Sequence, residues 1–267
     1  MNELLLPFLS FLIGIIVGLT GIGGASLITP MLIFVFQVPA SVAVSSDIVA
    51  ATLMKFFGGF SHWRQQTLDL QIVKWLAFGS VPGSLLGVEV LHVLRASSGF
   101  DPDMFLLHAI GVMILLVTLA GLLQIALSTL APEFQIASFP KLDLNTGMGR
   151  AGAIALGMVL GCMVGMTSVS SGSLFALVLI AFFQLDSRKL VGTDLAQAAI
   201  LLFFTSLGHL SLGTVNWGII LPIWLGSIPG VLLGSKLCQL APQRVLRVLI
   251  YALLIAVSWK LIFSNPI

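Results

Sequence analysis

The sequence predicts an all-α integral membrane protein built from two inverted repeats. Each repeat is expected to be a re-entrant or broken helical hairpin followed by three transmembrane helices. Three observations predict this fold: an apolar composition, a duplicated segment, and opposite charge at equivalent connectors. Of the 267 residues, 58% are hydrophobic and only 8% are charged, whereas ordinary soluble domains carry about 25% charged residues. Several apolar runs approach the length of about 20 residues that a bilayer-crossing helix needs.

The duplicated segment is the most specific of these observations. Residues 18–92 align without a gap on residues 165–239, at a fixed offset of 147, and 23 of the 75 aligned pairs are identical. A duplicated hydrophobic chain with polar residues at matched depths is typical of transporters built from internal repeats. The duplication divides the chain into a first transmembrane repeat (1–128), a linker (129–150) and a second transmembrane repeat (151–267).

Both repeats are predicted to contain the same elements in the same order. The first has apolar runs near 4–19, 27–38, 42–60, 72–94 and 105–128. The second has them near 151–166, 174–185, 188–207, 218–240 and 245–263. The first two runs of each repeat are short, because twelve helical residues rise about 18 Å against a hydrocarbon core of about 30 Å. They predict a hairpin that enters and leaves on one side, and the alternative is two separate spans per hairpin, giving ten crossings.

Equivalent connectors differ in charge. The connector 61–71 holds Arg64, whereas its partner 208–217 carries no charge. The connector 38–41 has no Lys or Arg, whereas its partner region carries two basic residues. This is what the positive-inside rule requires if the halves insert upside down relative to each other. Both chain termini then face outward, and the linker 129–150 faces the cytoplasm.

The break inside each hairpin combines small residues with hydroxyl side chains. The first presents Thr20, Gly21, Gly23, Gly24 and Ser26, and the second presents Thr167, Ser168, Ser170, Ser171 and Ser173. Each break is followed by a helix whose start exposes free N–H groups and the positive end of the helix dipole, an arrangement that binds anions. We expect the two breaks to meet near the bilayer midplane as the substrate site. The alternative is that small residues only allow close helix packing.

Ionisable residues also lie at matched depths. Asp47 and Asp194 follow a helix start by about 12 Å of rise, and an ionisable residue at that depth is a functional candidate. Each would carry a coupling proton, support a hairpin tip, or act only as a structural acceptor. Lys55 would snorkel toward the cytoplasm or attract an anion. His62 and His209 end equivalent helices, where the dipole favours them, and a gate or proton role is the alternative.

A glycine ridge marks the third long segment of each repeat. Residues 79–87 and 226–234 both read Gly-Ser-x-Pro-Gly-x-Leu-Leu-Gly. Glycine at i, i+4 and i+8 leaves one helix face without side chains, which predicts close helix packing with a hinge at the proline. If the ridge faces lipid, it favours a homodimer.

Several of these motifs together resemble the TauE/SafE family, the sulfite and organosulfonate exporters also called the toluene sulfonate uptake permease family. They are Gly-Leu-Thr-Gly-Ile-Gly-Gly-Ala-Ser-Leu-Ile-Thr-Pro at 18–30, Ser45-Ser46-Asp47, Gly192-Thr-Asp194 and the doubled proline motif. The resemblance covers essentially the whole chain. It implies a multi-pass plasma-membrane transporter of small sulfur oxyanions or organic anions. The chain departs from the family in the serines of its second break, and at Ser45-Ser46, where the family more often shows Thr-Ser.

The sequence therefore predicts a secondary transporter of a small anion that works by alternating access. Its expected partners are the anion, the lipid bilayer and a coupling proton, with no nucleic acid, metal, cofactor or enzymatic activity. Two alternatives remain. One is a passive anion channel, and the other is an intramembrane aspartyl protease that uses Asp47 and Asp194 as its catalytic pair.

Overall fold

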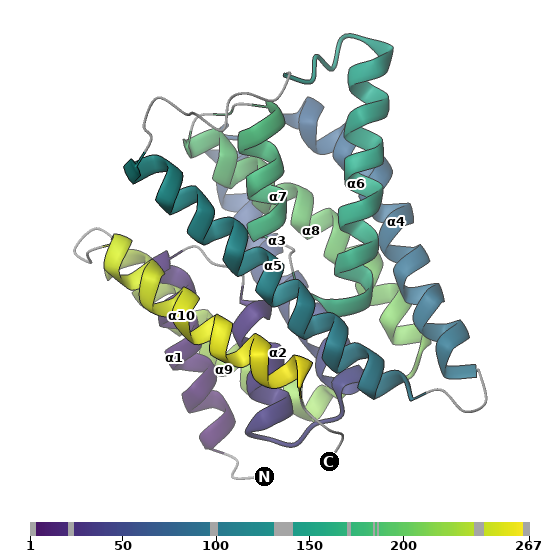
Figure 1. The fold of residues 1–267 in the computed structure, drawn as a ribbon, viewed down its shortest axis with the longest axis vertical. Helices are drawn as coiled ribbons and strands as arrows, with labels where there is room; N and C mark the ends of the chain where they lie inside the picture. The colour runs from purple at the N-terminus through teal and green to yellow at the C-terminus, as the bar shows by residue number, and fades with distance from the viewer. Residues whose placement is uncertain are drawn as a thin grey trace.

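The computed structural model describes residues 4–20, 24–96, 101–130, 141–169, 172–183, 185, 187–237 and 243–263. These residues form ten α-helices, one of them continued by a π-helical turn, and no strand (Figure 1). The elements are α1 (Leu5–Thr20), α2 (Ala25–Phe34), α3 (Ala40–Arg64), α4 (Leu70–Ala96), α5 (Pro102–Leu130), α6 (Gly147–Thr167), α7 (Ser173–Val178) with η2 (Leu179–Phe183), α8 (Ser187–Ser211), α9 (Trp217–Leu237) and α10 (Gln243–Ile262).

Six of these helices are long and apolar enough to cross a membrane. The qualifying stretches are Ala40–Arg64, Leu70–Ala96, Pro102–Leu123, Gly147–Thr167, Lys189–Ser211 and Trp217–Gly234. The prediction of an all-helical membrane protein is confirmed.

The predicted short run at 151–166 is wrong in length. The helix α6 begins at Gly147, because the Thr146 hydroxyl accepts a hydrogen bond from the Gly149 N–H at 3.1 Å and caps it. An N-cap of this kind satisfies a backbone donor that would otherwise have no partner. With 21 residues α6 is long enough to cross, whereas its equivalent α1 has 16.

The first helix of each half packs against the other half. α1 packs along α9, and α6 packs along α4, so the first helix of each half lies on a long helix of the other. The match extends to single residues: Gly79 lies against the backbone of Ile154, and Gly226 lies against the backbone of Pro7. Those two contacts are related by the offset of 147. The helices α3 and α8, which are equivalent to each other, also pack together, as do α5 and α10.

A second pair of matched contacts fixes the turns that precede α4 and α9. The Asp69 N–H donates to Thr193 Oγ1 at 3.0 Å, and the Asn216 N–H donates to Ser46 Oγ at 3.1 Å. The donors are equivalent residues, and so are the acceptors. The same set of contacts therefore occurs twice in the molecule with the two halves exchanged.

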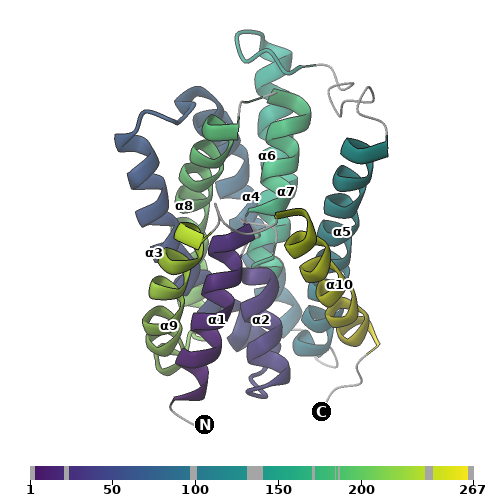
Figure 2. The same cartoon turned by 90° about the vertical axis from the view of Figure 1, so that its left-hand side faces the viewer.

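The first helices of the two halves start at opposite ends of the molecule. Figure 2 shows α1 starting at the end where both termini are marked, and α6 starting at the other end. In the same view α1 and α2 lie in the half of the molecule next to the termini, and α7 lies in the other half.

The glycine ridge of α4 is buried inside the chain. Gly79, Gly83 and Gly87 each lie against a carbonyl oxygen of α6, so a Cβ atom at any of them would overlap backbone. The predicted close helix packing is confirmed. The ridge does not face lipid, and it gives no support to a homodimer.

Candidate functional site

The first break leads into a helix with no exposed face. Gly24 precedes α2, and every residue from Ala25 to Ile33 is buried, Ser26 among them. Thr20 ends α1, but its side chain lies outside the described residues, as do Gly21 and Gly23. A helix buried on all sides places its polar side chains where only protein groups or an enclosed ligand can satisfy them.

The second break begins with a left-handed residue. α6 ends at Thr167, whose hydroxyl donates to the Met163 carbonyl oxygen of its own helix at 2.8 Å. Ser168 follows with φ of 60°, and its N–H donates to the Val164 carbonyl oxygen at 2.8 Å, which closes the helix end. The predicted residues Ser170 and Ser171 and the side chain of Ser173 lie outside the described part of the chain.

Asp47 collects hydroxyl groups from both halves. It is fully buried in α3. Its Oδ2 accepts a hydrogen bond from Thr29 Oγ1 of α2 at 2.8 Å and another from Ser168 Oγ at 2.8 Å. One carboxylate therefore joins the helix after the first break to the residue that opens the second. Within the described residues no donor reaches Asp47 Oδ1.

The equivalent carboxylate, Asp194, has a different partner. Its Oδ2 lies 3.7 Å from the Lys55 Nζ, and both side chains are largely buried. Lys55 thus meets a charge of the other half, which satisfies the requirement for a lysine at that depth. The Oδ1 of Asp194 also lacks a partner among the described residues. In the part of the chain that the structure describes, each aspartate therefore has one oxygen with a hydrogen-bond partner or counter-ion and one without.

The two equivalent histidines, His62 and His209, also have different partners. His209 is buried, with Nδ1 2.8 Å from Ser45 Oγ and Nε2 2.8 Å from the Gly165 carbonyl oxygen. It therefore links α8 to α3 and to the end of α6. His62 lies nearer the surface, with Nδ1 2.8 Å from Thr67 Oγ1 in the adjoining turn. Both end their helices as predicted.

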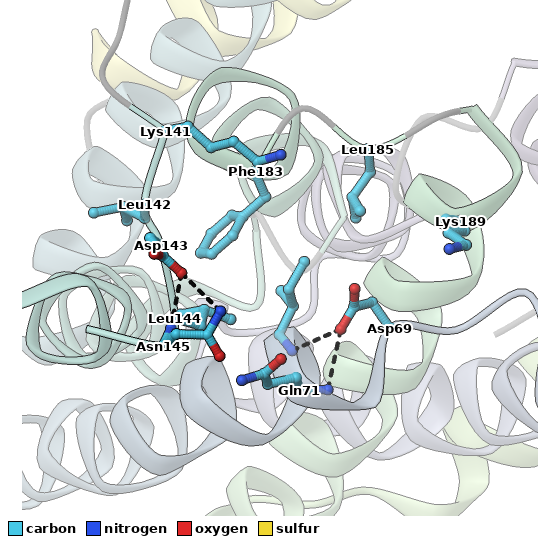
Figure 3. A pocket seen from close by; sticks show the side chains of 11 residues that line it. Asp69, Gln71, Lys141, Leu142, Asp143, Leu144, Asn145, Phe183, Leu185 and Lys189 are labelled. Atoms are coloured by element: carbon cyan, nitrogen blue, oxygen red, sulfur yellow. Dashed lines mark hydrogen bonds between the residues drawn. The ribbon is translucent and has the colours of Figure 1, made fainter. Parts of the chain in front are cut away.

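A polar cavity of about 600 Å³ lies where α4 and α8 begin and η2 ends. Figure 3 shows Lys141 and Lys189 at its edge, with Asp69 and Asp143 turned toward their own backbone. Asp69 Oδ1 accepts hydrogen bonds from two N–H groups at the start of α4, both at 3.1 Å. The lining of this cavity therefore combines two lysines with two carboxylates, Asp69 and Asp143.

Comparison with known proteins identifies the family. The family model for the sulfite exporter TauE/SafE matches residues 6–261. The chain belongs to this family. It is 36% identical over 250 residues to the probable membrane transporter protein YjnA of Bacillus subtilis, covering 94% of this chain and 96% of that protein. It is 25% identical over 256 residues to the probable membrane transporter protein YdhB of the same organism, covering 93% and 95%. None of the solved structures is a significant match.

Membership of the TauE/SafE family makes the chain a multi-pass membrane transporter and not an enzyme. The predicted family is confirmed, and the alternative of an aspartyl protease is wrong. Among the described residues, no group of three or more His, Cys, Asp or Glu side chains could hold a metal ion.

Sequence reasoning missed most of the partners in these contacts. The sequence motifs contain Thr29 and Ser45 without marking them as site residues, and nothing in the sequence pairs Lys55 with Asp194. One signal was available: Thr29 and Lys55 stand opposite Ala176 and Leu202 in the alignment of the repeats. The surroundings of Asp47 and Asp194 differ at positions where one half has a polar residue and the other has an apolar one.

Proposed function

We propose that this TauE/SafE protein is a secondary transporter of a small sulfur-containing anion, such as sulfite or an organosulfonate, across the plasma membrane by alternating access. The observation that carries the proposal is the bridge through Asp47, which joins α2 behind the first break to Ser168 at the second. Two broken hairpins that share one buried carboxylate would enclose a polar site within an apolar bundle, and transporters of this kind bind substrate at such breaks.

The inverted relation of the two repeats belongs to the same proposal. It is supported by contacts that recur with the halves exchanged and by α1 and α6 starting at opposite ends of the molecule (Figure 2). Inverted halves would provide inward-open and outward-open states of similar free energy, because exchanging their conformations converts one state into the other.

The substrate would lie between the two breaks. The backbone N–H groups at the start of α2 and of the helical segment 173–183 would face the anion, with hydroxyls of Thr20 and Ser26 as further partners. The Thr167 hydroxyl, which donates to the Met163 carbonyl oxygen here, would turn from that local bond to the anion when it binds. The Ser168 proton is committed to Asp47, so this side chain would support the site. Ser170, Ser171 and Ser173 complete the proposed second half of the site.

The open carboxylate oxygens offer a way to couple anion movement to protons. A proton on Asp194 would cancel its charge and leave Lys55 Nζ, 3.7 Å away, without a counter-ion. The lysine would then attract an anion more strongly, so proton and anion would favour each other's binding. Asp47 would carry a proton on Oδ1 in the same way, and His62 and His209 would respond as gates.

Flux into proteoliposomes tests this function. Labelled sulfite and a series of sulfonates would be offered to the wild type, to Thr20→Val and to Thr167→Val, with Thr52→Val as the matched control because its hydroxyl donates to Ile48 of its own helix. Thr52 matches Thr167, since each hydroxyl donates to the carbonyl four residues earlier in its own helix, but Thr52 lines an outer apolar hollow and not a break. We expect saturable, proton-dependent flux that falls about tenfold in the first two variants, as expected from losing one charge-assisted hydrogen bond to the anion, and stays unchanged in the control.

Two results would contradict the proposal. Unchanged flux in both Thr20→Val and Thr167→Val would remove the proposed site. Ohmic single-channel currents without counterflow of labelled anion would replace the carrier by a channel. A thermal-shift screen of the purified protein against sulfite, sulfate, thiosulfate, sulfonates and small carboxylates identifies the substrate, because a ligand of the folded state raises the melting temperature.

A further inference from the structure

A long apolar groove of about 930 Å³ runs between α3 and α8 on the outside of the bundle. Equivalent positions of the two halves face each other across it, as with Phe56 and Phe203, both more than half exposed. Both helices are candidate membrane spans. The groove therefore opens toward the hydrocarbon of the bilayer and not toward water.

One end of this groove is polar. A second hollow of about 450 Å³ adjoins it and shares Trp63, Leu68 and Leu70 with it, and its other lining residues are Arg64 and Gln66. Arg64 is exposed at the end of α3, and it makes no ion pair with any described residue. The equivalent positions in the second half are Ser211 and Gly213, which carry no charge. The groove is therefore cationic at the end of α3, whereas the end of α8 carries no equivalent charge.

The groove is long enough to follow an acyl chain through one leaflet of a bilayer. Along α3 its lining runs from Val49 to Trp63, which is about 21 Å of helix, whereas one leaflet contributes about 15 Å of hydrocarbon. The ring of Trp63 packs against Phe60, with centroids 5.8 Å apart, beside Arg64. Tryptophan and arginine side by side at the end of a membrane helix mark the headgroup level.

We infer that the α3/α8 groove binds an anionic phospholipid, with an acyl chain along the groove and the phosphate on Arg64. Arginine is the side chain best suited to bidentate recognition of phosphate. The connector after Arg64 is predicted to face the cytoplasm, where the leaflet is rich in anionic lipid. Arg64 favours this occupant over a second copy of the chain, because an apolar protein face would offer no negative group to pair with the guanidinium.

The experiment measures the thermal stability of delipidated protein in detergent, with phosphatidylglycerol or phosphatidylcholine added. We expect phosphatidylglycerol to raise the melting temperature more than phosphatidylcholine. In Arg64→Gln the apparent affinity for phosphatidylglycerol falls about tenfold, toward that for phosphatidylcholine, as loss of one charge-assisted contact predicts. Lys74→Gln is the matched control, because Lys74 is an exposed cation on α4 that does not line the groove and should keep the full preference.

A second variant tests the acyl chain. Ala199→Phe fills the groove from the α8 side, where Ala199 is a lining residue, and we expect it to weaken both lipids alike. Native mass spectrometry of the wild type should show a monomer that retains phosphatidylglycerol, and Arg64→Gln should retain less.

Four results would overturn the inference: an unchanged lipid preference in Arg64→Gln, an equal loss in Lys74→Gln, a lipid-free dimer that Ala199→Phe dissociates, or protection by p-toluenesulfonate alone that depends on Arg64.

Discussion

The two buried aspartates occupy equivalent positions of a duplicated fold and yet have different partners. Asp47 accepts hydrogen bonds from the hydroxyls of Thr29 and Ser168, whereas Asp194 lies against the Lys55 ammonium group. The backbones around them are matched, since the contacts of their helices recur with the halves exchanged. The difference therefore comes from side chains alone.

Three substitutions between the repeats account for it. The residues equivalent to Thr29 and Ser168 are Ala176 and Gly21, so no hydroxyl is available for Asp194 at those positions. The residue equivalent to Lys55 is Leu202, so no cation is available for Asp47. Each half keeps the carboxylate, but Asp194 is paired with Lys55 of the opposite half, whereas Asp47 accepts from Thr29 of its own half and Ser168 of the opposite one. The comparison teaches that duplication preserves the scaffold while the two polar sites acquire different chemistry.

The largest expected effect comes from breaking the ion pair. Asp194→Asn leaves Lys55 buried without a counter-ion, and we expect it to lower the free energy of unfolding by about 3 kcal/mol. Adding Lys55→Leu, which copies the residue at position 202, should recover most of that loss. Denaturation midpoints in detergent measure both. The exposed pair of Glu89 and His92, 3.8 Å apart, is the control, and Glu89→Gln should change stability by less than about 0.5 kcal/mol.

The opposite result would locate the difference elsewhere. If the double variant were no more stable than Asp194→Asn, the loss would come from Asp194 itself and not from an uncompensated lysine. The contrast between the two aspartates would then have to be sought in packing.

The next effect concerns the hydroxyls on Asp47. Thr29→Val and Ser168→Ala should each lower the free energy of unfolding by about 2 kcal/mol, since each removes a hydrogen bond to a charged group. Both end on the same oxygen, so the double variant should differ from the sum of the singles. Thr52→Val, whose lost hydroxyl bonds only its own helix, is the matched control. Losses no larger than in this control, and strictly additive, would show that the bridge does not hold the breaks together.

The histidines provide a smaller contrast. His209→Gln should lower the free energy of unfolding by about 1.5 kcal/mol, because one amide cannot reach both Ser45 and Gly165 and a buried group is left unsatisfied. His62→Gln should change it by less than about 0.5 kcal/mol, since His62 lies near the surface and contacts only the adjoining turn. Thermal unfolding in the same detergent compares the two. Equal shifts would mean that the buried contacts of His209 do not stabilise the fold.

How far the sequence could predict this molecule depends on what its pattern encodes. Periodicity and duplication predict the helices closely, and α3 and α8 contain the runs predicted near 42–60 and 188–207. The length of α6 was underestimated, because its first turn is polar and depends on the Thr146 cap. Asp47 and Asp194 were found as buried charges, but their partners were not, since Ser168 and Lys55 reach them across the interface between halves.

The smallest effect tests whether Ser45 is what makes His209 unlike His62. Ser45 Oγ contacts His209 Nδ1 at 2.8 Å and Thr214 Oγ1 at 2.6 Å, whereas the residue equivalent to Ser45 is Gly192, which has no side chain to offer His62. Ser45→Ala removes the contacts with His209 and Thr214 and a bond to Ser41 of its own helix. It should lower the free energy of unfolding by about 1 kcal/mol in the wild type, within the range of neutral hydrogen bonds, and by clearly less in a His209→Gln background, because contacting residues are coupled. Ser211→Ala, an exposed change on the same helix as His209, should give the same small value in both backgrounds. If Ser45→Ala behaved like that control, the serine would be a bystander, and the burial of His209 alone would explain why the two histidines differ.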